Sequence, residues 1–149
     1  MRSYARVISV PVDPESLGRT VKQVQYRNHR ALETALARVG TTLVQWDALR
    51  AIARVPGSSG RELAAETFQG EQSFGALAGR LEAQKLIERR PGRGRRVEHF
   101  ITEAGQRVLA AGRPVASGAL AESFAPLDEQ ERTTLLALLQ RVIDGAARG

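Results

Sequence analysis

A cluster of arginines in the second half of the chain is the strongest chemical signal in the sequence. Between residues 85 and 96 there are six cations and one anion, Glu88, so this segment carries +5 of the net charge of +6. The cations are Lys85, Arg89, Arg90, Arg93, Arg95 and Arg96. Guanidinium groups bind phosphate oxygens through paired hydrogen bonds, and such a concentrated basic patch is typical of a surface that binds nucleic acid. A general preference for arginine would explain the residue type but not the clustering.

The segment before this cluster predicts a helix that can enter a DNA groove. Phe74, Leu77 and Leu81 have the spacing of a core-facing stripe. The remaining surface carries small, amide and cationic side chains, namely Gln72, Ser73, Gly75, Ala76 and Arg80. Such side chains fit a major groove, where glutamine pairs with adenine and arginine with guanine or phosphate. A solvated face that contacts nothing is the alternative, and the adjoining basic segment favours DNA.

Other chemistries lack the residues they need. The chain has no cysteine, which excludes disulfides, thiolate metal sites and thiol redox sensing. The two histidines, His29 and His99, are far apart in sequence, so we expect no metal site and no cofactor. Ser73 has no histidine or acid placed to activate it as a nucleophile. We therefore predict that the protein is not an enzyme.

The elements around the cluster form a helix-turn-helix followed by a basic wing. Ser59-x-x-Glu62 is a capping box that begins a short helix, and a turn at Gln69-Gly70 leads into the helix of residues 71–84. Residues 86–90 and 97–101 read as two strands of a hairpin with a flexible, arginine-rich tip. His99 is expected on the surface of this hairpin.

Long helices flank this segment. Asp13-Pro14-Glu15 begins one that ends near Gly40, after an arm of residues 1–12 that is extended over 7–12. Further helices begin at Thr42, at Thr102 (with a kink near Pro114) and at Asp128. The last helix has too many apolar residues for a lone surface helix, so it forms either intramolecular core or, together with the long first helix, a dimer interface. These apolar residues are Leu135, Leu136, Leu138, Leu139, Val142 and Ile143.

Length and composition fit one soluble domain. The 149 residues, of which 42% are hydrophobic, suffice for a single core. No stretch approaches the ~20 apolar residues that span a bilayer, and the first residues lack the pattern of a signal peptide. We therefore expect a cytoplasmic protein without membrane contact.

Together these residues resemble the MarR family of bacterial winged-helix transcription regulators. The similarity runs from about residue 17 to 143 and is most specific in LAAETFQGEQSFGALAGRLEAQKLIERR, the basic wing and ITEAG. The resemblance implies a mainly α fold with a small β-hairpin wing. It divides the single protomer (1–149) into a dimerisation arm and helix (1–40), a winged helix-turn-helix lobe (41–102) and C-terminal dimerisation helices (103–149).

The resemblance also implies roles for individual residues. It places Gln72, Ser73, Gly75 and Ala76 against the bases and Arg80 against the DNA backbone. The wing residues Arg93, Arg95 and Arg96 would contact the flanking minor groove. Many members release DNA when a small anionic or phenolic effector binds between the dimer helices and the DNA-binding lobe. Candidates near such a pocket are His29, Arg30 and Trp46. A core role is favoured for Trp46, and Arg30 is equally compatible with a surface or interface role.

Three positions depart from the family pattern. Ala76 stands where a longer polar residue is common, Lys85 replaces the glycine that follows the recognition helix, and Arg93 lies near the place of a wing acid. We therefore expect charge to contribute more than base contacts. The sequence predicts a homodimeric repressor that binds double-stranded, pseudo-palindromic DNA. The alternative is a winged-helix module that binds a protein and no specific DNA.

Overall fold

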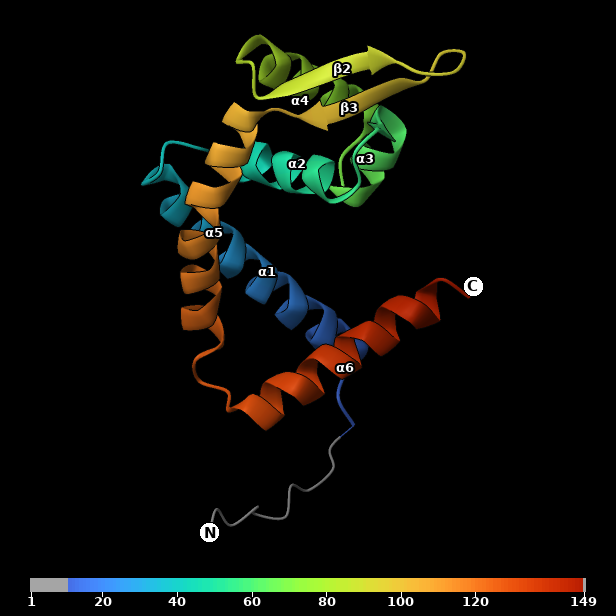
Figure 1. Cartoon of the computed structure of the whole chain (residues 1–149). Coiled ribbons are helices and arrows are strands. Elements are labelled where there is room, and N and C mark those ends of the chain that lie inside the picture. The colour runs from blue at the N-terminus through green and yellow to red at the C-terminus, as the bar shows by residue number, and fades with distance from the viewer. Residues whose placement is uncertain (1–10, 149) are drawn as a thin grey trace.

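The computed structural model describes residues 11–148, which form six helices and three short strands. In chain order they are α1 (Pro14–Ala37), α2 (Leu43–Arg54), β1 (Ser58–Ser59), α3 (Gly60–Glu66), α4 (Glu71–Ala83), β2 (Ile87–Pro91), β3 (Val97–Ile101), α5 (Glu103–Phe124) and α6 (Glu129–Ala146). Figure 1 shows a compact lobe of α2, α3, α4 and the hairpin at one end, from which α1 and α5 lead to α6 at the other. The predicted mainly α fold with a small β-hairpin wing is confirmed.

Side-chain caps fix the beginnings of all the described helices except α4, whose N-cap is Gly70. Asp13 accepts hydrogen bonds from the amides of Glu15 and Ser16. Ser59 and Asp128 each form a complete capping box with the glutamate three residues on. At Thr42 the hydroxyl accepts from the Gln45 amide at 3.2 Å. Since such caps depend on residues within one turn, they are readable from sequence alone.

The core of the lobe lies between α2, α3, α4 and the sheet. Its largest fully buried side chains come from all these elements and include Leu49, Ile52, Leu63, Phe74, Leu77, Leu81 and Ile87. The predicted apolar stripe of α4 is therefore confirmed. This packing holds α4 by one face and leaves its other face on the surface.

The sheet differs from the predicted hairpin in one respect. Its order is β1-β3-β2, because Ser58 and Ser59 pair with His99 and Glu98 as a third strand. The sequence did not indicate β1, since two serines carry no strand pattern and their partners lie 40 residues away. This pairing also places His99 in the interior, with 3% of its surface exposed, so its predicted place on the sheet surface is wrong.

The helices outside the lobe leave much apolar surface exposed. No residue of α6 is buried, and Leu136, Val142 and Ile143 are all more than 60% exposed. On α1, Leu17 and Val21 are at least half exposed. Helix α5 runs continuously through Pro114 and packs along α1. The predicted extended stretch 7–12 lies almost wholly outside the described residues.

Candidate nucleic-acid interface

Helix α4 presents to solvent all the residues that the sequence assigned to base and backbone contacts. Gln72, Ser73, Gly75, Ala76 and Arg80 are exposed. On the opposite side Phe74, Leu77 and Leu81 have at most 1% of their surface exposed. The exposed face carries one amide, one hydroxyl and one guanidinium among small residues. It is therefore polar and narrow enough to lie in a major groove.

The C-terminus of α4 is closed by a Schellman motif. The Lys85 amide donates to the Glu82 carbonyl and the Leu86 amide to the Leu81 carbonyl, both at 2.9 Å. Lys85 has a φ of +62°, the left-handed conformation that glycine adopts most easily. The replacement of the family's glycine by Lys85 therefore retains a glycine-like backbone conformation. The lysine also adds a cation at the C-terminal end of α4.

The six cations of the wing region fall into two groups. Three of them donate to nearby carboxylates: Arg89 to Glu82 at 2.9 Å, Arg90 to Glu88 at 2.7 Å and Arg96 to Glu62 at 2.8 Å. Among residues 11–148, Lys85, Arg93 and Arg95 have no such ion pair. Arg93 and Arg95 stand exposed in the loop between β2 and β3, so their guanidinium groups are available to phosphate.

Arg96 joins the base of the wing to the start of α3. Its guanidinium donates to Glu62 and, at 3.0 Å, to the carbonyl of Gly57. The hydrogen bond from Arg96, followed by that from the Ser59 amide, lowers the pKa of Glu62, and the same carboxylate raises the pKa of Arg96. The sequence grouped Arg96 with the DNA-contacting arginines and could not show this contact, because Glu62 is 34 residues away.

His99 connects the sheet to the recognition helix. Its Nδ1 lies 2.9 Å from the Ser58 carbonyl oxygen, and its ring meets the Phe74 ring edge-on at a centroid distance of 5.9 Å. The pKa of His99 is lowered, mainly because the ring is buried, and the hydrogen bond to the Ser58 carbonyl partly offsets this shift by raising the pKa. The imidazole therefore packs directly beneath α4, in surroundings that disfavour its charged form.

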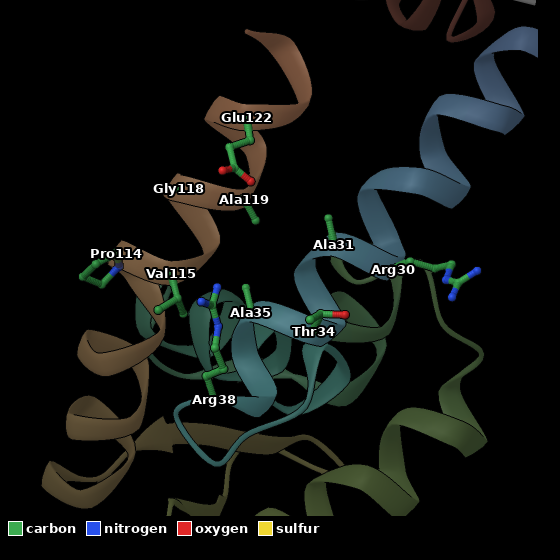
Figure 2. Close-up of a pocket in the computed structure, with 10 residues that line it drawn as sticks. All are labelled: Arg30, Ala31, Thr34, Ala35, Arg38, Pro114, Val115, Gly118, Ala119 and Glu122. Atoms are coloured by element: carbon green, nitrogen blue, oxygen red, sulfur yellow. The ribbon is translucent and has the colours of Figure 1, made fainter.

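A cavity of about 540 Å³ lies between α1 and α5. Of the three predicted ligand candidates, only Arg30 is among its lining residues, and Figure 2 shows its side chain pointing away from the space between the helices. Arg38 extends into that space and Glu122 lies above it on α5 (Figure 2). The sequence missed both residues, because only the packing of α1 on α5 brings them together.

The other two ligand candidates lie outside this cavity. His29 is exposed on α1 and faces Glu33, with 3.8 Å between Nε2 and Oε1. Trp46 packs against α5, and its indole N–H donates to the Leu109 carbonyl at 3.1 Å. Gly112 lies where the indole touches α5, and any side chain there would overlap it.

Within 11–148 no group of three or more His, Asp or Glu side chains is placed to hold a metal ion. No helix of this part of the chain is long and apolar enough to cross a membrane.

Comparisons with known proteins define the class of the fold. A probable transcriptional regulator from Pseudomonas aeruginosa is 27% identical, with a TM-score of 0.76 over 86% of this chain and 97% of that chain. A mutant MarR from E. coli, solved in complex with operator DNA, is 22% identical, with a TM-score of 0.78 over 85% of this chain and 93% of that chain. Bordetella bronchiseptica BpsR, whose DNA binding is regulated by 6-hydroxynicotinic acid, is 19% identical, with a TM-score of 0.79 over 85% of this chain and 98% of that chain. The chain is a winged-helix protein over most of its length.

The sequence of the lobe matches a known family. The model of the MarR family matches residues 39–96, which include α2, α3, α4, β2 and the wing loop. A comparison with curated proteins gives no significant match. The lobe thus matches the MarR family model, and the fold of the chain is that of winged-helix transcriptional regulators of known structure.

Proposed function

We propose that this protein is a homodimeric repressor that binds a specific, pseudo-palindromic DNA operator. The observation that carries the proposal is the polar, exposed face of α4 in the same small lobe as Arg93 and Arg95, which have no carboxylate partner within residues 11–148. An amide and a hydroxyl on a helix surface can read base edges, and free guanidinium groups supply affinity for phosphate. A regulator that acts on chromosomal DNA works in the cytoplasm.

Each predicted contact residue has a place in this proposal. Gln72 and Ser73, in the first turn of α4, face the bases, and the small residues Gly75 and Ala76 let the helix approach them closely. Arg80 binds the DNA backbone. Arg93 and Arg95 bind phosphates along the flanking minor groove, whose negative potential attracts arginine. Arg96 acts through Glu62 and orients the wing.

The exposed apolar surfaces of α1 and α6 support a dimer. Leu17 and Val21 on α1, and Leu136, Val142 and Ile143 on α6, are at least half exposed. An apolar surface of this extent is unusual for a monomer and typical of an interface. We propose that residues 1–40 and 103–149 form the dimerisation part and residues 41–102 the DNA-binding lobe.

The cavity between α1 and α5 supports an effector site. Its volume is in the range of small-molecule pockets, and the Arg38 guanidinium extends into it. A cation in such a place suits a small aromatic acid. 6-Hydroxynicotinic acid, the compound that regulates the related BpsR, has this chemistry and is a suitable first probe.

Fluorescence anisotropy tests the proposal with the DNA upstream of the protein's own gene and a scrambled duplex of the same composition. We expect the upstream duplex to bind at least about 10³-fold more tightly at physiological salt. Equal and strongly salt-dependent binding to both duplexes would contradict sequence-specific regulation. Absence of binding to either at low salt would favour a protein partner instead.

A further inference from the structure

One aromatic side chain stands almost entirely in solvent in the turn between the two helices of the helix-turn-helix. Phe68 is 96% exposed, more than any other large hydrophobic residue in the described part of the chain. A phenylalanine that contributes to folding is normally buried, so this ring gives the isolated protomer almost nothing. The ring is also absent from the packing of the lobe core.

The backbone conformation at position 68 is one that phenylalanine rarely adopts. Helix α3 ends in a Schellman motif, in which the Phe68 amide donates to the Ala65 carbonyl at 3.3 Å and the Gln69 amide to the Ala64 carbonyl at 2.9 Å. Phe68 therefore occupies the left-handed position, with a φ of +56°. Glycine adopts this conformation without strain, whereas a bulky residue there is an outlier. Folding alone would thus favour glycine over phenylalanine.

The position of Phe68 points to the surface that the ring serves. Phe68 lies two residues before Gly70, the N-cap of α4, so their Cα atoms are at most about 7.6 Å apart. Gln72 and Ser73, which follow Glu71 in the first turn of α4, are exposed. The ring is thus close to the end of the recognition helix from which bases are read.

The charges around the turn are compatible with DNA. Acids on both sides of it are each paired with an arginine: Glu66 with Arg54 and Glu71 with Arg61, both at 3.8 Å. These pairs reduce the repulsion that the two carboxylates would otherwise exert on phosphate. The surface around Phe68 is therefore apolar at its centre and electrically balanced at its edges.

We propose that Phe68 packs against apolar atoms of the DNA at the edge of the groove that α4 enters, either a thymine methyl group or deoxyribose carbons. Thymine methyl groups are the main apolar feature of the major groove, and phenylalanine is among the side chains that contact them. This proposal rests on the proposed function, because it adds a contact to the same interface. It explains why a strained, exposed ring stands where glycine would be the easier choice.

The test compares Phe68→Gly with Phe68→Tyr, which keeps the ring, and with Val44→Ala, which shortens an exposed apolar side chain on α2. Affinity is measured by anisotropy for the upstream duplex, and folding stability by urea unfolding. We expect Phe68→Gly to bind about tenfold more weakly while its urea midpoint is unchanged or higher. Phe68→Tyr should retain most of the affinity, and Val44→Ala should match the wild type.

Replacing thymine by uracil in the duplex identifies the contacted atoms, because uracil lacks only the methyl group. If the ring touches a methyl group, one such replacement weakens the wild type and leaves Phe68→Gly unchanged. If the ring touches deoxyribose, Phe68→Gly loses affinity equally for all these duplexes. The Phe68 contact alone is overturned if the wild type discriminates between upstream and scrambled DNA and Phe68→Gly binds the upstream duplex as tightly as the wild type does. Failure of the wild type to bind DNA overturns the proposed function as well.

Discussion

Arg93 and Arg95 at the wing tip allow the salt dependence of DNA binding to be predicted. Each phosphate contact contributes about 0.9 to the slope of log affinity against log salt concentration. Arg93 and Arg95 have no carboxylate partner among the described residues, so both are available for phosphate. Replacing both by alanine should flatten the slope by up to about 1.8 for one wing, and by up to about 3.6 for a dimer that uses both wings.

Anisotropy titrations at several salt concentrations measure this slope. The matched control is Arg19→Ala with Arg113→Ala, which removes the same charge from exposed positions on α1 and α5. This control should lower affinity slightly and leave the slope near that of the wild type, since non-contacting charges act only through a screened field. An unchanged slope for the wing variant, or an equal change in the control, would refute the assignment of phosphate contacts to the wing tip.

Three further predictions concern stability and assembly. Gly112→Ala should destabilise the fold by about 1–3 kcal/mol in urea unfolding, because its methyl group would overlap Trp46, whereas Gly118→Ala, in open space on the same helix, should stabilise it by up to about 1 kcal/mol. Burial lowers the pKa of His99, so the unfolded state binds the proton more readily; the urea midpoint should therefore fall as the pH drops below about 6.5, and His99→Gln should flatten this dependence. Leu136→Asp, on the exposed face of α6, should reduce the solution mass from twice 16.2 kDa to 16.2 kDa in light scattering, and an unchanged mass would place the interface elsewhere.

The features that the sequence predicted well depend on residues close together in the chain. The capping box of Ser59 and Glu62 spans one helical turn, and it marks where α3 begins. The stripe of Phe74, Leu77 and Leu81 repeats with the helical period, so it identified both the buried face of α4 and, by exclusion, the exposed one. The MarR resemblance added the order of the elements and the place of the wing.

The features that it could not predict depend on contacts between distant segments. Strand β1 exists only because Ser58 meets His99, and the same contact buries a histidine that sequence reasoning placed on the surface. The sequence also could not identify the partner of Arg96. From its local sequence Glu62 is part of a helix cap, and its hydrogen bond from Arg96 depends on the three-dimensional fold. The lining of the cavity between α1 and α5 comes from two helices whose residues are about 80 positions apart. Such contacts are set by tertiary packing, which leaves no periodic pattern in either segment.

In the proposed complex, two winged-helix lobes of one dimer bind one DNA site in a defined register. A hydroxyl-radical footprint on the upstream duplex tests this directly. We expect two protected blocks, related by symmetry and centred about one helical turn apart or a multiple of it, with protection that persists at physiological salt. Even protection along the whole duplex that disappears as salt is raised would contradict it, because charge alone would then hold the protein on DNA.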